Sequence, residues 1–286
     1  MAMYRWTRLS SQKWEDVWQE RLQFLGPGSV VMITWPESRA LKIEAFCDKT
    51  TASGLVQNFG GRSTRLAHHH WTGDPVRPRA PIPIRGRLFI HPDHSTWHAA
   101  ADPARHLFIP AGMAFGTGDH ATTASCLRLL VDASNQLASG WTAIDAGTGS
   151  GILAIAAKKL GAARVEAIDS DPACIRIARE NARTNKCRNV SVRRGDARKI
   201  SAVPRVDVIT ANLFSELLIA SAPAFSKRLK PGGWLIFSGV LRSQKDAVIA
   251  ALLQCGFAPP RIVNRGKWCA GSTQLRSTEP RGKRHS

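Results

Sequence analysis

The sequence predicts an α/β fold for its second part, preceded by a small α+β domain. From residue 121 onward, short apolar runs typical of strands alternate with runs of helical periodicity, which predicts a parallel sheet covered by helices on both faces. A glycine-rich turn joins the first strand of this series, 142–146, to the helix that follows. Before residue 72 two strand-like segments follow each other directly, an order that a purely alternating fold does not contain.

The glycine-rich turn has the spacing of a nucleoside-binding cradle. Gly147, Gly149 and Gly151 follow the strand, and a helical run starts at residue 152. Glycines let the backbone approach a ligand closely and turn into a helix whose N-terminus is electropositive. Asp169 ends the next strand, 22 residues after Gly147, where a carboxylate can accept hydrogen bonds from both hydroxyls of a ribose.

The spacing favours S-adenosylmethionine over a dinucleotide. The dinucleotide motif places its third glycine five residues after the first, whereas Gly151 comes four residues after Gly147. Asp145 lies two residues before the first glycine, where its charge would repel a pyrophosphate. A carboxylate there suits a ligand with a cationic amino group and a sulfonium.

Four further residues are candidates for this site. Phe115 lies in a loop of small residues, 112–120, whose backbone could pass close over a ligand. Thr123 lies in the first turn of the helix predicted at 121–137. Asp196 follows the strand at 190–194 and could accept from an adenine amino group or simply form a turn. Asn212 ends the apolar strand at 206–213, the end at which parallel sheets place chemistry. His120 is considered as a general base, although a structural role in its loop is favoured.

Residues 1–72 predict a small α+β domain of ferredoxin-like order that recognises the substrate. Strands are expected at 4–9, 30–35, 40–46 and 62–71, with helices at 12–25 and 50–59. Trp14 and Trp18 recur at helical spacing and are expected in the core of this domain. A linker with one short strand at 87–90 is expected over residues 73–104, and the second domain over residues 105–277. Residues 278–286 are expected to form a disordered basic tail.

Composition narrows the classes of protein to consider. No apolar run of 18 residues exists, and residues 1–20 lack the apolar stretch of a secretory signal, so a cytoplasmic protein without a membrane span is expected. The six cysteines are scattered without a C-x-x-C pair, which argues against a zinc site or a disulfide framework. His91, His94 and His98 have no acidic or thiol partner at ligand spacing, so no metal is predicted.

Positive charge is concentrated in the second part of the chain. The formal net charge is +19, of which residues 104–286 carry +15. Ten basic residues and only two acidic ones lie between positions 176 and 205. Such a surface attracts polyanions and makes nonspecific attraction to RNA or the ribosome one interpretation. A solvated basic surface that only keeps the protein soluble is the other.

Three blocks together resemble the PrmA family, the methyltransferases of large-subunit ribosomal protein eleven. They are F-G-T-G-D-H with two threonines at 115–123, the glycine block at 144–162, and the segments 209–214 and 229–241. The resemblance implies a class I (Rossmann-like) S-adenosylmethionine-dependent methyltransferase domain with a seven-stranded sheet whose last strand is antiparallel. It implies cofactor contacts at Thr123, Gly147, Asp169 and Asn212, and methylation of lysine or amino-terminal amines of a ribosomal protein. Asn212 is the candidate for orienting the cofactor or the amine.

Two alternative functions stay open at this stage. An RNA or DNA amino-methyltransferase would fit the basic half, but such enzymes carry Pro-Pro-aromatic after the strand-end Asn, whereas Leu213-Phe214-Ser215 follows Asn212. A non-catalytic, ribosome-associated binding module would need a decayed cofactor site. The intact acidic and glycine residues of the cradle argue against decay.

Overall fold

The computed structural model describes residues 3–25, 28–35, 38–66, 80–92, 94–98, 102–110, 120–200 and 204–277. The chain divides into two compact units, Met1–Arg77 and Pro78–Ser286, and each is described by itself. Within the described ranges, no helix is both long enough and apolar enough to cross a membrane.

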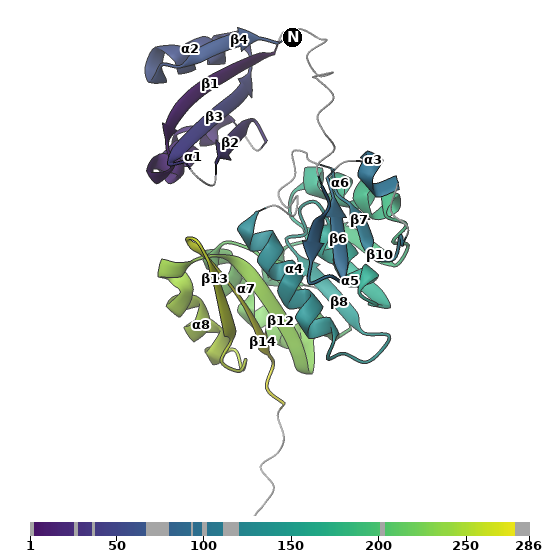
Figure 1. Ribbon diagram of the computed structural model, residues 1–286. Helices are drawn as coiled ribbons and strands as arrows, with labels where there is room; N and C mark the ends of the chain where they lie inside the picture. The colour runs from purple at the N-terminus through teal and green to yellow at the C-terminus, as the bar shows by residue number, and fades with distance from the viewer. Residues whose placement is uncertain are drawn as a thin grey trace, which may run out of the picture. The chain divides into compact units, whose positions relative to one another are not determined.

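The first unit is an antiparallel sheet with helices in the predicted β-α-β-β-α-β order (Figure 1). The sheet order is β2-β3-β1-β4, and every strand pair in it is antiparallel. The elements are β1 (Tyr4–Ser11), η1 (Gln12–Trp14), α1 (Glu15–Arg21), η2 (Gln23–Leu25), β2 (Val30–Thr34), β3 (Ala40–Cys47), α2 (Lys49–Phe59) and β4 (Arg62–Arg65). The predicted strand at 62–71 therefore ends at Arg65, and residues 67–71 lie outside the described residues.

The core of the first unit contains only one of the two tryptophans predicted there. Trp18 is 4% exposed and packs with Trp6 and Leu22, whereas Trp14 is 49% exposed. The predicted helix at 12–25 is divided into two 3-10 turns and a short α-helix. A 3-10 turn has three residues per turn instead of 3.6, so Trp14 in η1 is rotated off the apolar face that α1 buries.

The second unit is built on a seven-stranded sheet of order β10-β9-β8-β11-β12-β14-β13. Neighbouring strands from β10 to β12 are parallel, and β14 is antiparallel to both β12 and β13. The predicted class and the antiparallel last strand are confirmed. The elements are α4 (Ala121–Ser134), β8 (Thr142–Ala146), α5 (Ile152–Lys159), β9 (Arg164–Asp169), α6 (Pro172–Thr184), β10 (Val190–Arg194), η3 (Ala197–Lys199), β11 (Val206–Asn212), α7 (Ser215–Arg228), β12 (Leu229–Leu241), η4 (Arg242–Gln244), α8 (Lys245–Gln254), β13 (Arg261–Arg265) and β14 (Trp268–Gln274).

Helices cover both faces of this sheet because its strands are apolar on both sides. Ala143 and Val208 pack in a cluster with residues of α4, α5 and α6, whereas their neighbours Ile144 and Ile209 pack in a second cluster with α7 and α8. Alternate residues of a strand point to opposite faces, so one strand supplies both clusters. Figure 1 shows α4 lying across the sheet on the face opposite α7 and α8.

The described residues between 80 and 110 contain more secondary structure than the linker predicted at 73–104. It forms a second, three-stranded sheet from β5 (Ile82–Ile84), β6 (Leu88–His91) and β7 (His106–Phe108), together with the short helix α3 (His94–His98). Ile84, Ile90 and Leu107 are fully buried in the same core cluster as α4 and α5. The sequence predicted one strand here because prolines and histidines separate the short apolar runs.

Candidate active site

The predicted cofactor residues meet where parallel strands end. Ala146 of β8 is paired with Ile168 of β9 and with Ala211 of β11. Gly147, Asp169 and Asn212, which follow these residues, therefore lie at the same carboxyl edge of the sheet. Ligands of open parallel sheets bind at this edge.

The glycine turn is tied by hydrogen bonds to the neighbouring strand β9. The backbone N–H groups of Gly147 and Thr148 donate to the carbonyl oxygen of Ile168, at 2.9 and 3.0 Å. Gly147 has φ 73°, and a Cβ built on it would lie 2.4 Å from Cδ2 of Leu213. A side chain at this position is therefore disfavoured by the backbone conformation and would also require the end of the Leu213 side chain to shift.

Asp145 lies beneath the turn and is 1% exposed. One carboxylate oxygen accepts from Thr148 Oγ1 at 2.6 Å and from the Ala154 N–H at 3.2 Å, and the other accepts from Thr210 Oγ1 at 2.7 Å. The sequence placed this carboxylate toward a cationic ligand. The structure instead directs both oxygens to the protein, so Asp145 holds the turn, α5 and β11 together.

The buried charge of Asp145 predicts a pH dependence of stability. Burial raises the pKa of Asp145 to about 6, against about 3.9 in an unfolded chain. Between about pH 4 and pH 6 the folded protein retains this proton while the unfolded chain releases it, so the free energy of unfolding falls as pH rises. The contribution is about 3 kcal/mol across this window.

This contribution is measured by comparing wild type with Asp145→Asn in urea denaturation between pH 4 and pH 7. We expect the wild type to lose more stability than the variant as pH rises, because the amide does not titrate. The difference between the two curves removes the contribution of other carboxylates. Parallel curves for the two proteins would contradict the prediction.

Asp169 reaches from the end of β9 to the glycine turn. One oxygen accepts from the Gly149 N–H at 2.9 Å and the other from the Asp171 N–H at 3.0 Å. The side chain is half-buried, and an ionised carboxylate offers about four acceptor positions. Two of them are therefore left for donors such as ribose hydroxyls.

Asn212 and Thr123 come together from β11 and the first turn of α4. The Asn212 Nδ2 donates to Thr123 Oγ1 at 3.3 Å, and Thr123 is 1% exposed. The Asn212 Oδ1 atom is buried and has no hydrogen-bond partner among the described residues. A buried carbonyl oxygen without a donor costs about 1–3 kcal/mol, so this atom fits a site that a ligand N–H completes.

Of the other predicted residues, two have structural roles in the fold and one lies outside the described residues. Asp196 begins η3, where its carboxylate accepts from the Arg198 N–H at 2.9 Å and pairs with the Arg198 guanidinium, which lowers the pKa of Asp196. The turn-forming role is thus observed, and adenine binding stays a prediction. His120 is the N-cap of α4, with Nδ1 2.7 Å from Thr122 Oγ1. Phe115 lies outside the described residues.

Three residues that shape the site were missed from the sequence. Thr148 and Thr210 donate to the buried Asp145, and Gly239 of β12 makes room for the backbone of Leu213. Thr210 is paired with Asp145 across neighbouring strands. A buried carboxylate needs donors, but the sequence does not show which side chains supply them.

Gly239 predicts a stability difference between two glycines of similar conformation. Gly239 has φ 86° and its added Cβ would lie 2.5 Å from the carbonyl oxygen of Leu213, whereas Gly232 has φ 75° and nothing within 4 Å. Gly232→Ala should lower the free energy of unfolding by about 1–2 kcal/mol through backbone strain alone. Gly239→Ala should cost about 1–3 kcal/mol more, because backbone must move. Equal midpoints in urea denaturation would contradict this.

The described residues contain no metal cluster at this site, and one pocket of the second unit lies elsewhere. No group of three or more His, Cys, Asp or Glu in the described part of the chain could hold a metal ion. A pocket of about 210 Å³ lies between the second half of α4 and the strands β12, β14 and β13, lined by residues that include Asp132, Trp234 and Arg261. It contains none of the predicted cofactor residues.

The residues at the sheet edge fit the predicted cofactor. The carboxylate of Asp169 has acceptor positions left for a ribose, and Asn212 offers an unpartnered buried oxygen for an amine. Gly147 has a left-handed backbone conformation that favours glycine beside them. These are features that a nucleoside with an amino group would complete, and they come from three neighbouring strand ends.

Comparisons with known proteins agree with this geometry. A family model described as "Ribosomal protein L11 methyltransferase (PrmA)" matches residues 43–276. The ribosomal protein L11 methyltransferase of Thiobacillus denitrificans is 46% identical over 225 residues, which cover 76% of this chain and 73% of that protein. Its counterpart in Dechloromonas aromatica is 38% identical over 247 residues, covering 82% of this chain and 79% of that protein.

A solved structure gives the same result for the fold. The crystal structure of ribosomal protein L11 methylase from Lactobacillus delbrueckii subsp. bulgaricus matches with a TM-score of 0.61 and 28% identity, over 70% of this chain and 100% of that chain. The predicted resemblance, the Rossmann-like methyltransferase fold and S-adenosylmethionine as the cofactor are thereby confirmed. With a family match across most of its length, the chain belongs to the ribosomal protein L11 methyltransferase (PrmA) family.

Proposed function

We propose that this protein transfers methyl groups from S-adenosylmethionine to lysine side chains, and to the terminal amine, of ribosomal protein L11. Its relatives carry that substrate in their names. The observation that carries the proposal is the unpartnered Oδ1 of Asn212 at the carboxyl edge of the sheet. An acceptor there is suited to an N–H group at the point where a methyl group would be transferred.

The cofactor is proposed to lie across the ends of β8, β9 and β11. Asp169 would accept from the ribose hydroxyls, and the turn at Gly147 and Gly149 would pass beneath it. Bound S-adenosylmethionine supplies an electrophilic methyl group on a sulfonium. Thr123 would fix the orientation of Asn212 through the 3.3 Å hydrogen bond. Phe115 and Asp196 remain proposed cofactor contacts.

The accepting amine must reach the site without its extra proton. A free lysine has a pKa of about 10.4, so its ammonium form dominates at neutral pH. Removal of water and a nearby positive charge both favour the neutral amine. Asn212 Oδ1 would accept a hydrogen bond from one of the remaining N–H groups and so orient the nitrogen lone pair toward the methyl group. Catalysis is then mainly a matter of positioning.

The proposed partner and location follow from the substrate. A ribosomal protein of the large subunit is made in the cytoplasm, and we propose that the enzyme acts there. The +15 charge of residues 104–286 supports an additional, nonspecific attraction to ribosomal RNA.

The proposal is tested by incubating the purified protein with labelled S-adenosylmethionine and either purified ribosomal protein L11 or protein-free ribosomal RNA. We expect label on the protein only, and mass spectrometry of its peptides should place the added methyl groups on lysine or terminal amines. L11 with the modified lysines changed to arginine is the matched control substrate, and it should lose the corresponding label.

The other outcomes point to the alternatives. Label on the RNA alone would make the protein a nucleic-acid methyltransferase. No transfer to either substrate, together with no S-adenosylmethionine binding by calorimetry, would identify a non-catalytic binding module. Label on side chains other than amines would overturn the lysine assignment while leaving protein methylation intact.

A further inference from the structure

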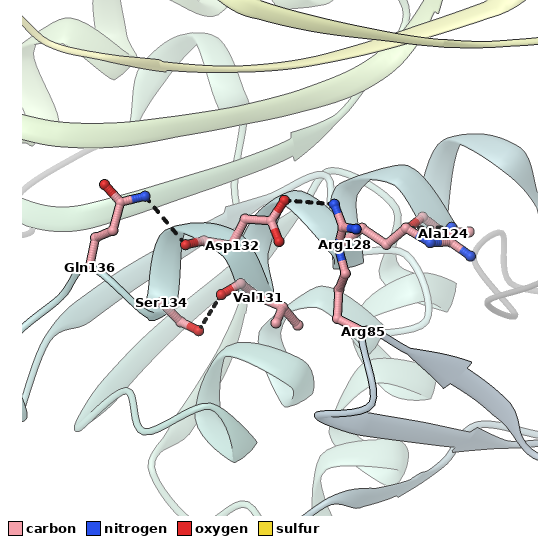
Figure 2. Close-up of polar contacts among 7 residues, drawn as sticks. All are labelled: Arg85, Ala124, Arg128, Val131, Asp132, Ser134 and Gln136. Carbon is pink, nitrogen blue, oxygen red and sulfur yellow. Dashed lines mark hydrogen bonds and ion pairs between the residues drawn. The ribbon is translucent and has the colours of Figure 1, made fainter.

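Two arginines, one within α4 and one in the turn between β5 and β6, contact polar groups of α4. Arg85, in the turn between β5 and β6, pairs through Nη2 with Asp132 Oδ2 at 2.8 Å. Arg128 lies one helical turn before Asp132, and its Nη1 donates to the Ala124 carbonyl oxygen at 3.1 Å. Figure 2 shows both side chains on the same side of α4, one reaching Asp132 and the other extending toward Ala124.

A third arginine, Arg265, is the last residue of β13, a strand that packs against α4. Burial, followed by the charges of Arg265 and Arg85, lowers the pKa of Arg128. Arg85 and Arg265 are therefore both near enough to Arg128 for their charges to act on it. Asp132 is the one carboxylate that pairs with any of the three among the described residues, so two positive charges are left over.

The turn that carries Arg85 is anchored to α4. Arg87, two residues after Arg85, donates from Nη1 to Asn135 Oδ1 at 2.5 Å, so the β5–β6 turn is attached to α4 at two points. Arg85 and Arg265 are exposed and Arg128 is half-buried. The guanidinium groups of Arg85 and Arg128, each held by a hydrogen bond, can donate to an oxyanion with little further loss of side-chain freedom.

We propose that Arg85, Arg128 and Arg265 form a binding site for a phosphate group. The phosphate can belong to an RNA backbone or be free in solution, and the geometry supports the same contacts in both cases. For RNA, the site deepens the attraction proposed above by assigning it to a particular face. It requires nothing of the methyl-transfer site.

The RNA source is tested with the full chain and a fluorescently labelled 12-nucleotide RNA, followed by anisotropy at several salt concentrations. Arg128→Gln/Arg265→Gln removes two charges but leaves the Arg85–Asp132 pair. The matched control, Arg183→Gln/Arg188→Gln, removes two exposed arginines, one from the last turn of α6 and one from the segment between α6 and β10. We expect the first variant to bind about tenfold more weakly or worse near 0.1 M salt, with a salt slope lower by about 1–2, and the control to change much less.

The free-phosphate source is tested by thermal unfolding in 10 mM phosphate and in chloride of equal ionic strength. We expect phosphate to raise the midpoint of the wild type and of the control variant, but not that of Arg128→Gln/Arg265→Gln. Unfolding in chloride shows whether each variant is folded. It should show the double variant at least as stable as wild type, because repulsion at the site is removed.

The results separate the site from general attraction. Phosphate stabilisation without RNA binding would support the site for a small oxyanion and overturn the RNA attraction. An equal loss of RNA affinity in both variants, without selective phosphate stabilisation, would leave general attraction standing and overturn the site. Wild type showing neither RNA binding nor phosphate stabilisation would overturn both, whatever the outcome for methyl transfer.

Discussion

Replacement of Asn212 by alanine is expected to lower kcat/KM for methylation of the ribosomal protein by about 10²–10³-fold, the usual loss when a preorganised polar group at a reacting centre is removed. Its Oδ1 is buried and unpartnered, and its Nδ2 donates to Thr123. The loss should be mainly in kcat, because the ribose contacts of the cofactor do not depend on this side chain.

A matched pair of variants tests whether orientation is what matters. Thr123→Val removes the acceptor that fixes Asn212 and keeps the shape of the side chain, so we expect a smaller loss of about tenfold, also in kcat. Calorimetry should show S-adenosylmethionine binding within a few-fold of wild type for both variants. Full activity of Asn212→Ala would contradict the proposed role.

The same replacement should have little effect on the stability of the ligand-free protein. A buried carbonyl oxygen without a donor costs about 1–3 kcal/mol, which offsets the packing and the single long hydrogen bond that alanine loses. We therefore expect urea denaturation to show a change within about 1 kcal/mol. A group that is retained at a cost to stability is typical of a functional site.

Most of the second unit follows from local patterns in the sequence. Each predicted strand from 142 to 241 is present, because buried parallel strands are continuous apolar runs and the glycine and proline residues between them end each element. The start of β12 differs. It begins at Leu229 instead of Trp234, since Leu229 pairs with Val206 before the register shifts. A proline and two glycines in this stretch are atypical of a strand, so the sequence does not predict this pairing.

The residues that could not be predicted depend on contacts between distant segments. Thr210 faces Asp145 across 65 residues of sequence, and nothing near Thr210 shows that a carboxylate lies opposite. Gly239 resembles any strand glycine until the backbone of Leu213 is placed beside it. The position of Asp145 in the motif points to the ligand. Its burial and its three donors become visible only in the fold.

The same reason explains why the sequence does not predict the three arginines at or near α4. Arg85, Arg128 and Arg265 are far apart in the sequence, and net charge alone favoured the region between residues 176 and 205. Several arginines there already have partners. Arg193 pairs with Glu166, and Arg179 donates to the Val192 carbonyl oxygen. Charge density along the chain therefore does not show where unneutralised charges meet.

Replacement of Asp169 by alanine is expected to raise the dissociation constant for S-adenosylmethionine by about 100-fold. A carboxylate that accepts from two ribose hydroxyls contributes two hydrogen bonds to a charged group, each of about 1.5–3 kcal/mol. The lower limit for the pair, about 3 kcal/mol, corresponds to slightly more than a factor of 100. Loss of the acceptor for the Gly149 N–H would loosen the turn as well. We expect isothermal titration calorimetry to show this change.

Asp171→Ala is the matched control, because it removes the same charge two residues away. Asp171 is the N-cap of α6, where its side chain accepts from the Ala173 N–H at 2.8 Å, so its loss should cost about 1 kcal/mol of stability and little cofactor affinity. Asp169→Asn keeps an oxygen for Gly149 but loses the charge, and should bind with intermediate affinity. Saturating cofactor should restore most of kcat in both Asp169 variants, since the carboxylate binds the ribose and does not contact the amine. Equal dissociation constants for Asp169→Ala and Asp171→Ala would show that Asp169 does not bind the cofactor.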